Sequence, residues 1–416
     1  MVLLCLAECP VCGTVQDCAE GHSAPHRDQE PIAKSFHRQA VQQNKQELVS
    51  FLEPEQLVLS KGGAAKLVNT VRSMSEMRRD FVVVKVDLKN AFNEVHRAAI
   101  IESLQAEPSL QHLAWFAAVS LSPEVGFKSG GVLWGKAGEG ETQGDPKAGA
   151  FFCVAIQPQV RELCSAVREA GGVGLFGMDD GYVVGPSEVV FPAVERFERR
   201  LLESCGLVLQ RAKTEVFSWD GVLPRDTPAD MVLAGKEVEG EFMPGYMCYG
   251  VPVGSRGYVC QVLNEKVEQI AEQAEKAVKM LEGERQSLWS VVKWSLSQRF
   301  EYWLQLSYPS DVKAAAVALD RKLLRVLEAC IGSQIPEGGA SDCVIEGPAD
   351  TAASIHGLSF QQLVVRLPIK MGGLGIRNQE QLRYAAFVGA VEQCVPQIGV
   401  STGLCPTLAQ QFGEDE

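Results

Sequence analysis

Valine-rich and apolar runs predict a buried sheet in the middle of the chain. Residues 81–86 form such a run, and it ends at Asp87. This pattern predicts a buried strand with a carboxylate at its C-terminal end. Two further apolar runs, 174–176 and 182–184, flank the polar stretch 177–181, which reads Gly-Met-Asp-Asp-Gly. They predict two buried strands joined by a two-residue turn, with two adjacent acids at its tip.

Helical periodicity lies on both sides of this strand pattern. The predicted helices span residues 46–51, 64–79, 189–205 and, as two or more long helices that end near Gly332, 261–334. A helix is also expected to start at 147–152, and strands and turns are expected over 221–260. Strands that alternate with helices over 81–220 favour an α+β fold.

The acids Asp87, Asp179 and Asp180 carry the clearest chemistry. Adjacent carboxylates in apolar surroundings repel each other and are costly to desolvate, and a divalent cation removes both costs. Three converging carboxylates can hold two Mg²⁺ ions roughly 3.5–4 Å apart for in-line phosphoryl transfer. Two structural alternatives stay open. Asp180-Gly181 can form an ordinary hairpin turn, and Asp87 can be a helix N-cap.

The acids lie in ordered blocks that resemble the reverse transcriptases of non-LTR (LINE-type) retrotransposons. Residues 87–93 resemble motif A of that family, and Gln143-Gly144-Asp145-Pro146 resembles motif B. Residues 178–181 resemble motif C, with Met178 where alanine is common. Each block alone is weak evidence, and their order along the chain is what makes the resemblance specific.

Three later blocks continue the resemblance. Residues 206–215, which include Lys213, resemble motif D. Residues 249–254 match the Gly-x-Pro-x-Gly block at the start of the primer-grip region, and 367–377 resemble a block late in the thumb. The six blocks extend over roughly residues 30–390.

The resemblance implies a right-hand polymerase. Its palm would carry the antiparallel sheet with the Asp-Asp hairpin, beside partial fingers and a helical thumb. The implied divisions are a leader at 1–28, partial fingers at 29–80, palm at 81–220, primer-grip-like strands at 221–260, thumb at 261–334 and a C-terminal helical extension and tail at 335–416.

The implied activity is RNA-directed DNA polymerisation with Mg²⁺ or Mn²⁺ as cofactor. The partners would be an RNA template, a DNA primer and deoxynucleoside triphosphates. By resemblance, Asp87 and Asp179 bridge both ions, and Asp180 is a weaker or outer ligand. One ion lowers the pKa of the primer 3′ hydroxyl, and the other neutralises charge on the triphosphate.

Other site residues also follow from the resemblance. Phe92 takes the place of the aromatic gate that rejects a ribose 2′ hydroxyl, although aromatic residues more often belong to the core. Gln143 and Gly144 would contact the template and the incoming nucleotide, and the alternative is a plain surface turn. Lys213 would act as a general acid or charge clamp at the leaving pyrophosphate, and the alternative is a solvated lysine.

Lys34 and Arg38 lie where the family's fingers bind the triphosphate. This chain has Glu30 before Pro31, where the family usually carries arginine. Because glutamate repels a triphosphate, this departure predicts weaker nucleotide binding.

The net charge of −13 is unusual for a nucleic-acid enzyme, since such proteins usually present a basic face. It supports an alternative function, a catalytically weak or inactive reverse-transcriptase-like module that binds nucleic acid. A third alternative is a DNA-templated or template-independent nucleotidyl transferase with the same palm. No nuclease domain is visible in the sequence, so a truncated copy of an element is expected.

Cysteine and histidine residues near the start of the chain suggest a metal site. Cys9, Cys12, His22 and His26 have the C-x2-C and H-x3-H spacings of zinc ligands. The gap between the two pairs is shorter than in a typical finger, so the alternative is a scatter of residues in an unstructured leader.

The sequence has 13 cysteines and no convincing signal peptide. This combination predicts reduced thiols in an intracellular protein. By resemblance that protein is nuclear, and no apolar run is long enough to span a membrane.

Overall fold

The computed structural model describes residues 31–122, 125–129, 132–142, 144–332, 335 and 364–402. They form two compact units. The first contains the residues up to Ser255 and those from Gln393 onward, and the second contains Arg256–Glu392. The predicted leader, Glu30, Gln143 and the four candidate zinc ligands Cys9, Cys12, His22 and His26 lie outside the described residues.

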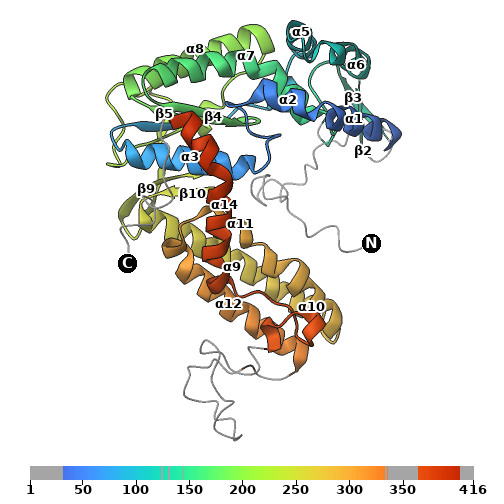
Figure 1. Cartoon of the computed structure of the whole chain (residues 1–416), viewed down its shortest axis with the longest axis vertical. Helices are drawn as coiled ribbons and strands as arrows, with labels where there is room; N and C mark the ends of the chain where they lie inside the picture. The colour runs from blue at the N-terminus through green and yellow to red at the C-terminus, as the bar shows by residue number, and fades with distance from the viewer. Residues whose placement is uncertain are drawn as a thin grey trace, which may run out of the picture. The chain divides into compact units, whose positions relative to one another are not determined.

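A five-stranded sheet is the centre of the first unit (Figure 1). Its strands, in spatial order, are β4 (Val173–Gly177), β5 (Asp180–Gly185), β1 (Val82–Val86), β6 (Glu215–Phe217) and β7 (Val232–Leu233). All neighbours pair antiparallel except β6 and β7, which are parallel. The structure confirms the three strands predicted around the acids, and the α+β class with an antiparallel sheet.

Helices cover both faces of this sheet. On one face, Val84, Val86 and Val183 are buried in the main core, against α7 (Ala148–Glu169) and α8 (Ser187–Cys205) (Figure 1). The opposite face packs on α3 (Gly63–Met77). Because successive strand residues point to opposite faces, Lys85 and Asp87 lie on the α3 side.

Several further elements precede α7. They are α1 (Pro31–Gln43), α2 (Lys45–Leu52), α4 (Ala91–Glu94), α5 (Arg97–Ala106), α6 (Gln111–Leu121), and the hairpin of β2 (Val125–Ser129) and β3 (Val132–Ala137). Helices α2, α3 and α8 were predicted from periodicity. Helix α6 was not, because it is apolar almost throughout and so lacks a polar face that marks a helix.

The first unit also contains a second sheet, of three strands, just before Ser255. It has the order β10 (Val251–Gly254), β9 (Glu241–Cys248), β8 (Gly235–Val238). The strands and turns predicted for 221–260 are therefore present, but they stop at Ser255 because α9 already begins at Arg256.

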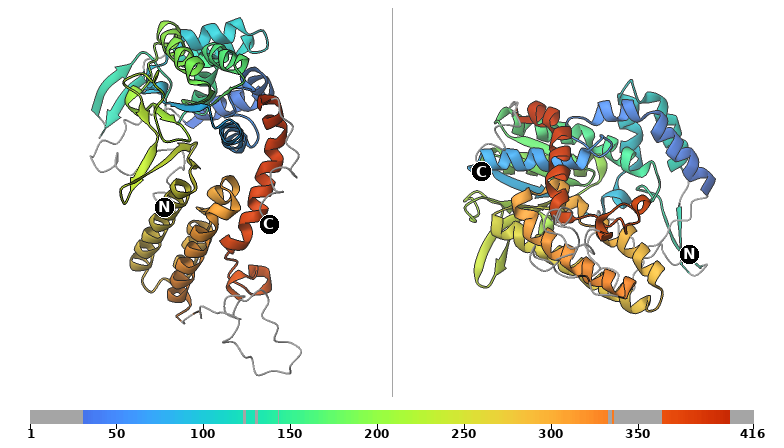
Figure 2. Two further views of the ribbon diagram at one scale, coloured as in Figure 1. Left: turned by 90° about the vertical axis from the view of Figure 1, so that its left-hand side faces the viewer. Right: turned by 60° about the horizontal axis from the view of Figure 1, so that its bottom comes forward.

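The second unit is helical. Its described elements include α9 (Arg256–Met280), α10 (Arg285–Trp294), α11 (Glu301–Leu306), α12 (Pro309–Ile331), 3₁₀ turns at Leu296–Gln298 and Ile369–Met371, and most of α14 (Gln379–Thr402). Helices α9 and α12 lie side by side (Figure 2). Helix α12 ends at Ile331 and is capped by Gly332, whose φ of 70° is the left-handed conformation that glycine favours.

Asp320 connects two helices of the second unit. Its carboxylate oxygens accept hydrogen bonds from the backbone N–H groups of Gln379 and Glu380, at 3.2 and 3.1 Å, at the start of α14. Arg366 forms an ion pair with the same carboxylate at 3.1 Å. An acid at a helix start is favoured by the free N–H groups there. In the described part of the chain, no helix is both long and apolar enough to cross a membrane.

Candidate active site

The two adjacent acids lie at the β4–β5 hairpin. Gly177 pairs with Asp180, so Met178 and Asp179 form the two-residue turn. The predicted turn is confirmed, and the alternative in which Asp180-Gly181 forms it is wrong because both residues belong to β5. Met178 has a φ of 67°, a left-handed conformation that is uncommon for a residue with a side chain. Backbone strain of this kind concentrates at functional sites.

Asp87 lies beside this hairpin. Strand β1 pairs with β5 so that Val86 is opposite Gly181, and continuing that register by one residue places Asp87 opposite Asp180. Directly opposite residues on antiparallel strands have Cβ atoms about 4.5–5.5 Å apart. The N-cap of α4 is Asn90, so the alternative in which Asp87 caps that helix is wrong.

The three acids influence one another electrostatically. Burial raises the pKa of Asp180 to about 6, and the charges of Asp179 and Asp87 raise it while Lys85 opposes the shift. Burial also raises the pKa of Asp179, with a further contribution from Asp87. The structure therefore brings together the three carboxylates singled out in the sequence, in surroundings where their negative charges are costly.

The side chains of these three residues are chemically suited to bind a hard cation. Their donors are all carboxylate oxygens, which suit Mg²⁺ and Mn²⁺. Within the described ranges, no three His, Cys, Asp or Glu side chains form a ready-made metal cage. Mg²⁺ often uses one or two carboxylates and completes its shell with substrate phosphates and water. The carboxylates are half-buried, so they stay accessible to such a shell.

Lys213 is connected to Asp87 through the backbone. The N–H of Gln210 donates to the carbonyl of Asp87 at 2.8 Å, and the N–H of Lys213 donates to the carbonyl of Gln210 at 2.8 Å. Lys213 ends the 3₁₀ turn Arg211–Lys213, and it is exposed. The fold thus places motif D next to motif A, and both interpretations of the lysine remain predictions.

Phe92 and Gly144 lie near the start of α7. The Phe92 ring is 4.7 Å from the Phe152 ring and packs partly against the core. The Phe92 carbonyl accepts a hydrogen bond from the N–H of Glu141 at 2.6 Å, which ties motif A to the approach of motif B. Gly144 has a φ of 80°, and among the described residues a Cβ there would meet no atom within 4 Å. Its backbone is therefore open to a ligand.

A buried charge network holds the motif B turn. Lys147 Nζ pairs with Glu141 Oε2 at 2.5 Å and with Asp145 Oδ2 at 3.3 Å. His37 of α1 donates through Nδ1 to both carboxylate oxygens of Asp145, at 3.0 and 2.9 Å. Burial raises the pKa of Glu141, and the Lys147 ammonium opposes that shift. The network links α1 to the turn that begins α7.

The sequence alone did not indicate that His37 belongs to the site. Lys34 and Arg38, which were singled out, lie on the same helix, with Lys34 half-buried and Arg38 exposed. The residue of α1 that reaches motif B is the buried histidine between them. Its partner is 108 positions away, so no local pattern could reveal the pair.

The Gly-x-Pro-x-Gly block lies against the acidic hairpin. Tyr249, at the turn between β9 and β10, donates its backbone N–H to the hydroxyl oxygen of Tyr182 at 2.7 Å. Tyr182 follows the acids on β5 and is almost fully buried. A Cβ on Gly177 would collide with the Tyr249 ring. The two turns are thus in direct contact, although they are far apart in sequence.

Gly177→Ala tests this contact. We expect the variant to lose about 2 kcal/mol of unfolding free energy because the added methyl overlaps an aromatic ring. Thermal unfolding measures the loss, and Tyr249→Ala in the same chain should restore part of it. The matched control is Gly138→Ala, where a Cβ meets no atom of the described part of the chain within 4 Å. Equal stability of Gly177→Ala and the control would show that the turns are not packed together.

Comparison with known proteins finds similarity in sequence to a retrotransposon protein. No family model matches the chain. The chain is 23% identical to the retrotransposable element SLACS 132 kDa protein of Trypanosoma brucei gambiense in an alignment of 334 residues that covers 78% of this chain. The chain spans about a quarter of that relative, 25%. This similarity confirms the resemblance to retrotransposon proteins that the ordered motifs indicated.

Solved structures of telomerases also align with the chain. Telomerase from Candida albicans, in complex with a TWJ fragment of telomeric RNA, aligns with a TM-score of 0.44 and 12% identity over 92% of this chain and 55% of that one. Apo telomerase from Candida tropicalis aligns with a TM-score of 0.41 and 12% identity over 91% and 60%. A form truncated from its C-terminal domain gives 0.35 and 16% over 52% and 44%.

Proposed function

We propose that this chain is the reverse-transcriptase domain of a retroelement, an RNA-directed DNA polymerase that uses Mg²⁺ or Mn²⁺. The observation that carries the proposal is the pairing of β1 with β5 up to Val86 and Gly181, next to Asp87 and Asp180, together with the effect of the Asp87 and Asp179 charges on the pKa of Asp180. The order of the motifs and the similarity to a retrotransposon protein support it. Its partners would be an RNA template, a DNA primer and deoxynucleoside triphosphates.

The proposed site combines metal binding with exclusion of ribonucleotides. When bound, the ions would activate the primer 3′ hydroxyl and neutralise the triphosphate. Asp87 and Asp179 would hold the ions, and Asp180 would be an outer ligand. Lys213 would face the leaving pyrophosphate from motif D. Phe92, held by its contact with Phe152, would present a flat ring to the sugar and reject a 2′ hydroxyl.

Other parts of the first unit would position the substrates. The open backbone at Gly144 would allow close approach of the nucleotide, with Gln143 beside it in sequence. The β9–β10 turn at Tyr249 would act as the primer grip, since it packs directly on the acidic hairpin. In this scheme residues 29–80, with Lys34 and Arg38, form partial fingers, 81–220 the palm, and 261–334 the thumb.

His37→Ala tests whether the buried network positions the nucleotide. Removing a hydrogen bond to a buried carboxylate should cost about 2 kcal/mol of unfolding free energy. Because the motif B turn would then be misplaced, we expect the KM for the nucleotide to rise about tenfold with a smaller change in kcat. Steady-state extension kinetics and thermal unfolding measure the two effects.

His112→Ala is the matched control for His37→Ala. His112 Nε2 lies 2.6 Å from Asn44 Oδ1, so it connects α6 to the residue between α1 and α2 and not to the motif B turn. Its KM should match the wild type. An unchanged KM for His37→Ala would contradict the positioning role.

The net charge of −13 favours a second candidate, a reverse-transcriptase-like module that binds nucleic acid without copying it. Primer extension separates the two candidates. Purified protein is incubated with poly(rA)–oligo(dT), dTTP and Mg²⁺ or Mn²⁺, and product length is followed on a gel. The proposal predicts extension that EDTA abolishes. Binding of the hybrid without extension would establish the second candidate instead.

A further inference from the structure

Two neighbouring segments of the second unit contain basic and no acidic residues, although the chain as a whole is acidic. They are α10 (Arg285–Trp294) and residues 364–378. Neither contains an acidic residue, while the whole chain has a net charge of −13. Their basic residues are Arg285, Lys293, Arg366, Lys370 and Arg377.

Direct contacts join the two segments. The indole N–H of Trp289, on α10, donates to the carbonyl of Leu374 at 3.2 Å. The Lys293 side chain crosses the backbone at Gly375, where a Cβ would collide with its ammonium group and lie 3.4 Å from Ile369 Cγ1. The end of α10 and the 3₁₀ turn Ile369–Met371 therefore border one surface.

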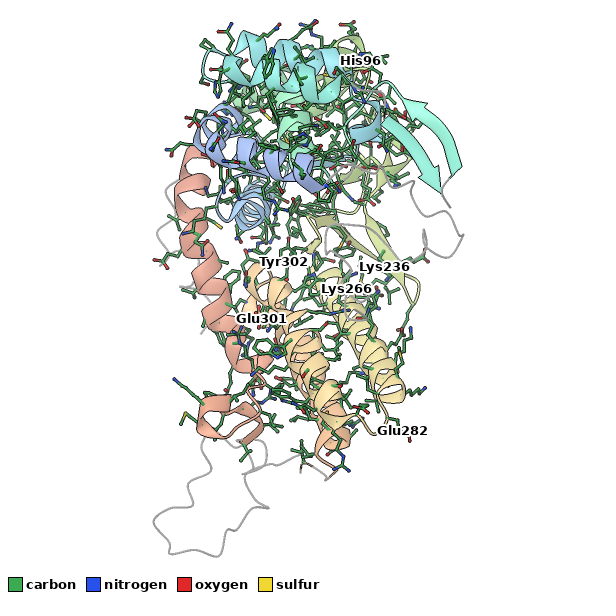
Figure 3. All side chains as sticks on the ribbon, turned by 90° about the vertical axis from the view of Figure 1, so that its right-hand side faces the viewer. His96, Lys236, Lys266, Glu282, Glu301 and Tyr302 are labelled. Atoms are coloured by element: carbon green, nitrogen blue, oxygen red, sulfur yellow. The ribbon has the colours of Figure 1, made fainter. Side chains whose placement is uncertain are left out.

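Two of the cations have carboxylate partners. Arg366 pairs with Asp320 at 3.1 Å, and Arg377 pairs with Glu301 of α11 at 2.7 Å (Glu301 is labelled in Figure 3). Lys293 instead lies over aromatic rings, with Nζ 5.6 Å from the centre of Trp289 and 4.8 Å from that of Trp294.

Large apolar side chains are exposed around these cations. Trp294 is 63% exposed, Met371 is 63% exposed and Ile369 is 49% exposed. Lys370, between the last two, is also exposed. We call Lys293, Trp294, Ile369, Lys370 and Met371 together the Trp294 surface.

We infer that the Trp294 surface binds single-stranded RNA. A base stacks on the open face of Trp294, and Lys293 and Lys370 face the phosphates on either side, the combination that proteins use for single strands. The local positive charge, opposite to that of the whole chain, favours a polyanion over an apolar protein partner. The inference deepens the proposed function and rests on it only in taking RNA as a partner.

Fluorescence anisotropy of the full chain with a labelled 20-nucleotide RNA of mixed sequence tests the inference. Trp294→Ala should weaken binding about tenfold, and Trp294→Phe, which keeps a ring for stacking, should restore most of it. Lys293→Gln with Lys370→Gln should make the slope of log affinity against log salt shallower by about 1.4, or about 0.7 for each phosphate that the protein no longer neutralises. The matched control is Lys279→Gln with Met280→Ala, exposed residues at the end of α9 near Glu282 (Figure 3).

Several results would overturn the inference. One is unchanged RNA affinity and salt slope in all surface variants. Another is an equal loss in the control pair. A third is a larger loss for DNA of the same sequence than for RNA. A change of sedimentation coefficient in Trp294→Ala with unchanged RNA binding would assign the surface to self-association instead. Failure of the polymerase proposal is distinguished by a separate readout, because primer extension by the wild-type chain tests that proposal and the RNA affinity of the Trp294 surface variants tests this inference.

Discussion

Asp179→Asn should lower the rate of metal-dependent primer extension on the order of a thousandfold or more. The substitution keeps the shape of the side chain but removes one of the two charges that would hold both ions. A metal ion supplies several kcal/mol of transition-state stabilisation, and each 1.36 kcal/mol is a factor of ten in rate. Gel-based extension under single-turnover conditions measures the effect.

Asp80→Asn is the matched control for Asp179→Asn. Asp80 is an exposed acid two residues before β1, and it pairs locally with Arg78 at 2.9 Å. An exposed pair of this kind contributes little to stability, so the control should extend primers at the wild-type rate. Full activity in Asp179→Asn would contradict the assignment of this residue as a metal ligand.

Asp180→Asn should stabilise the metal-free protein at neutral pH, although it impairs the proposed activity. The pKa of Asp180 is raised from 3.8 to about 6 by burial and by Asp179. A raised acid pKa means that the folded state holds the proton more tightly than the unfolded state, so stability falls as pH rises from about 4 to about 6. Asparagine stays neutral and avoids up to about 3 kcal/mol of this cost.

Thermal unfolding in EDTA at two pH values measures this effect. At pH 7.5 we expect the midpoint of Asp180→Asn to exceed that of the wild type by roughly 5 °C, and at pH 4 the two should agree. Mn²⁺ should narrow the gap at pH 7.5, because it stabilises the wild type by neutralising its carboxylates. A lower midpoint for Asp180→Asn at pH 7.5 in EDTA would show that no such repulsion exists.

Much of the candidate site could be predicted because its signals are local. The valine run that ends at Asp87 and the apolar runs around Asp179-Asp180 each predict a strand, and the structure has all three. Asp87 was expected beside the acidic pair because it ends a predicted strand and because the motif order matches that of the polymerase family. The pairing of β1 with β5 supplies the physical reason, because it sets Val86 opposite Gly181 and so brings the neighbouring residues Asp87 and Asp180 together.

The contacts that surround the acids could not be predicted, since they join distant parts of the chain. His37 reaches Asp145 across 108 positions, and Tyr249 packs on a glycine of β4. Neither His37 nor Tyr249 lies in a sequence pattern that indicates which residue it contacts. Helix α6 was missed for a different reason. It is apolar nearly all round, so its periodicity is hidden.

The most direct test of the account is a crystal structure of the protein soaked with Mn²⁺, with anomalous scattering to locate the metal. The central claim is that Asp87 and Asp179 hold the same ions. The account predicts anomalous density within about 2.0–2.4 Å of carboxylate oxygens from both residues, a distance expected for Mg²⁺-like coordination. Density that touches only one of them, or an Asp87 side chain directed away from the hairpin in the soaked crystal, would contradict it.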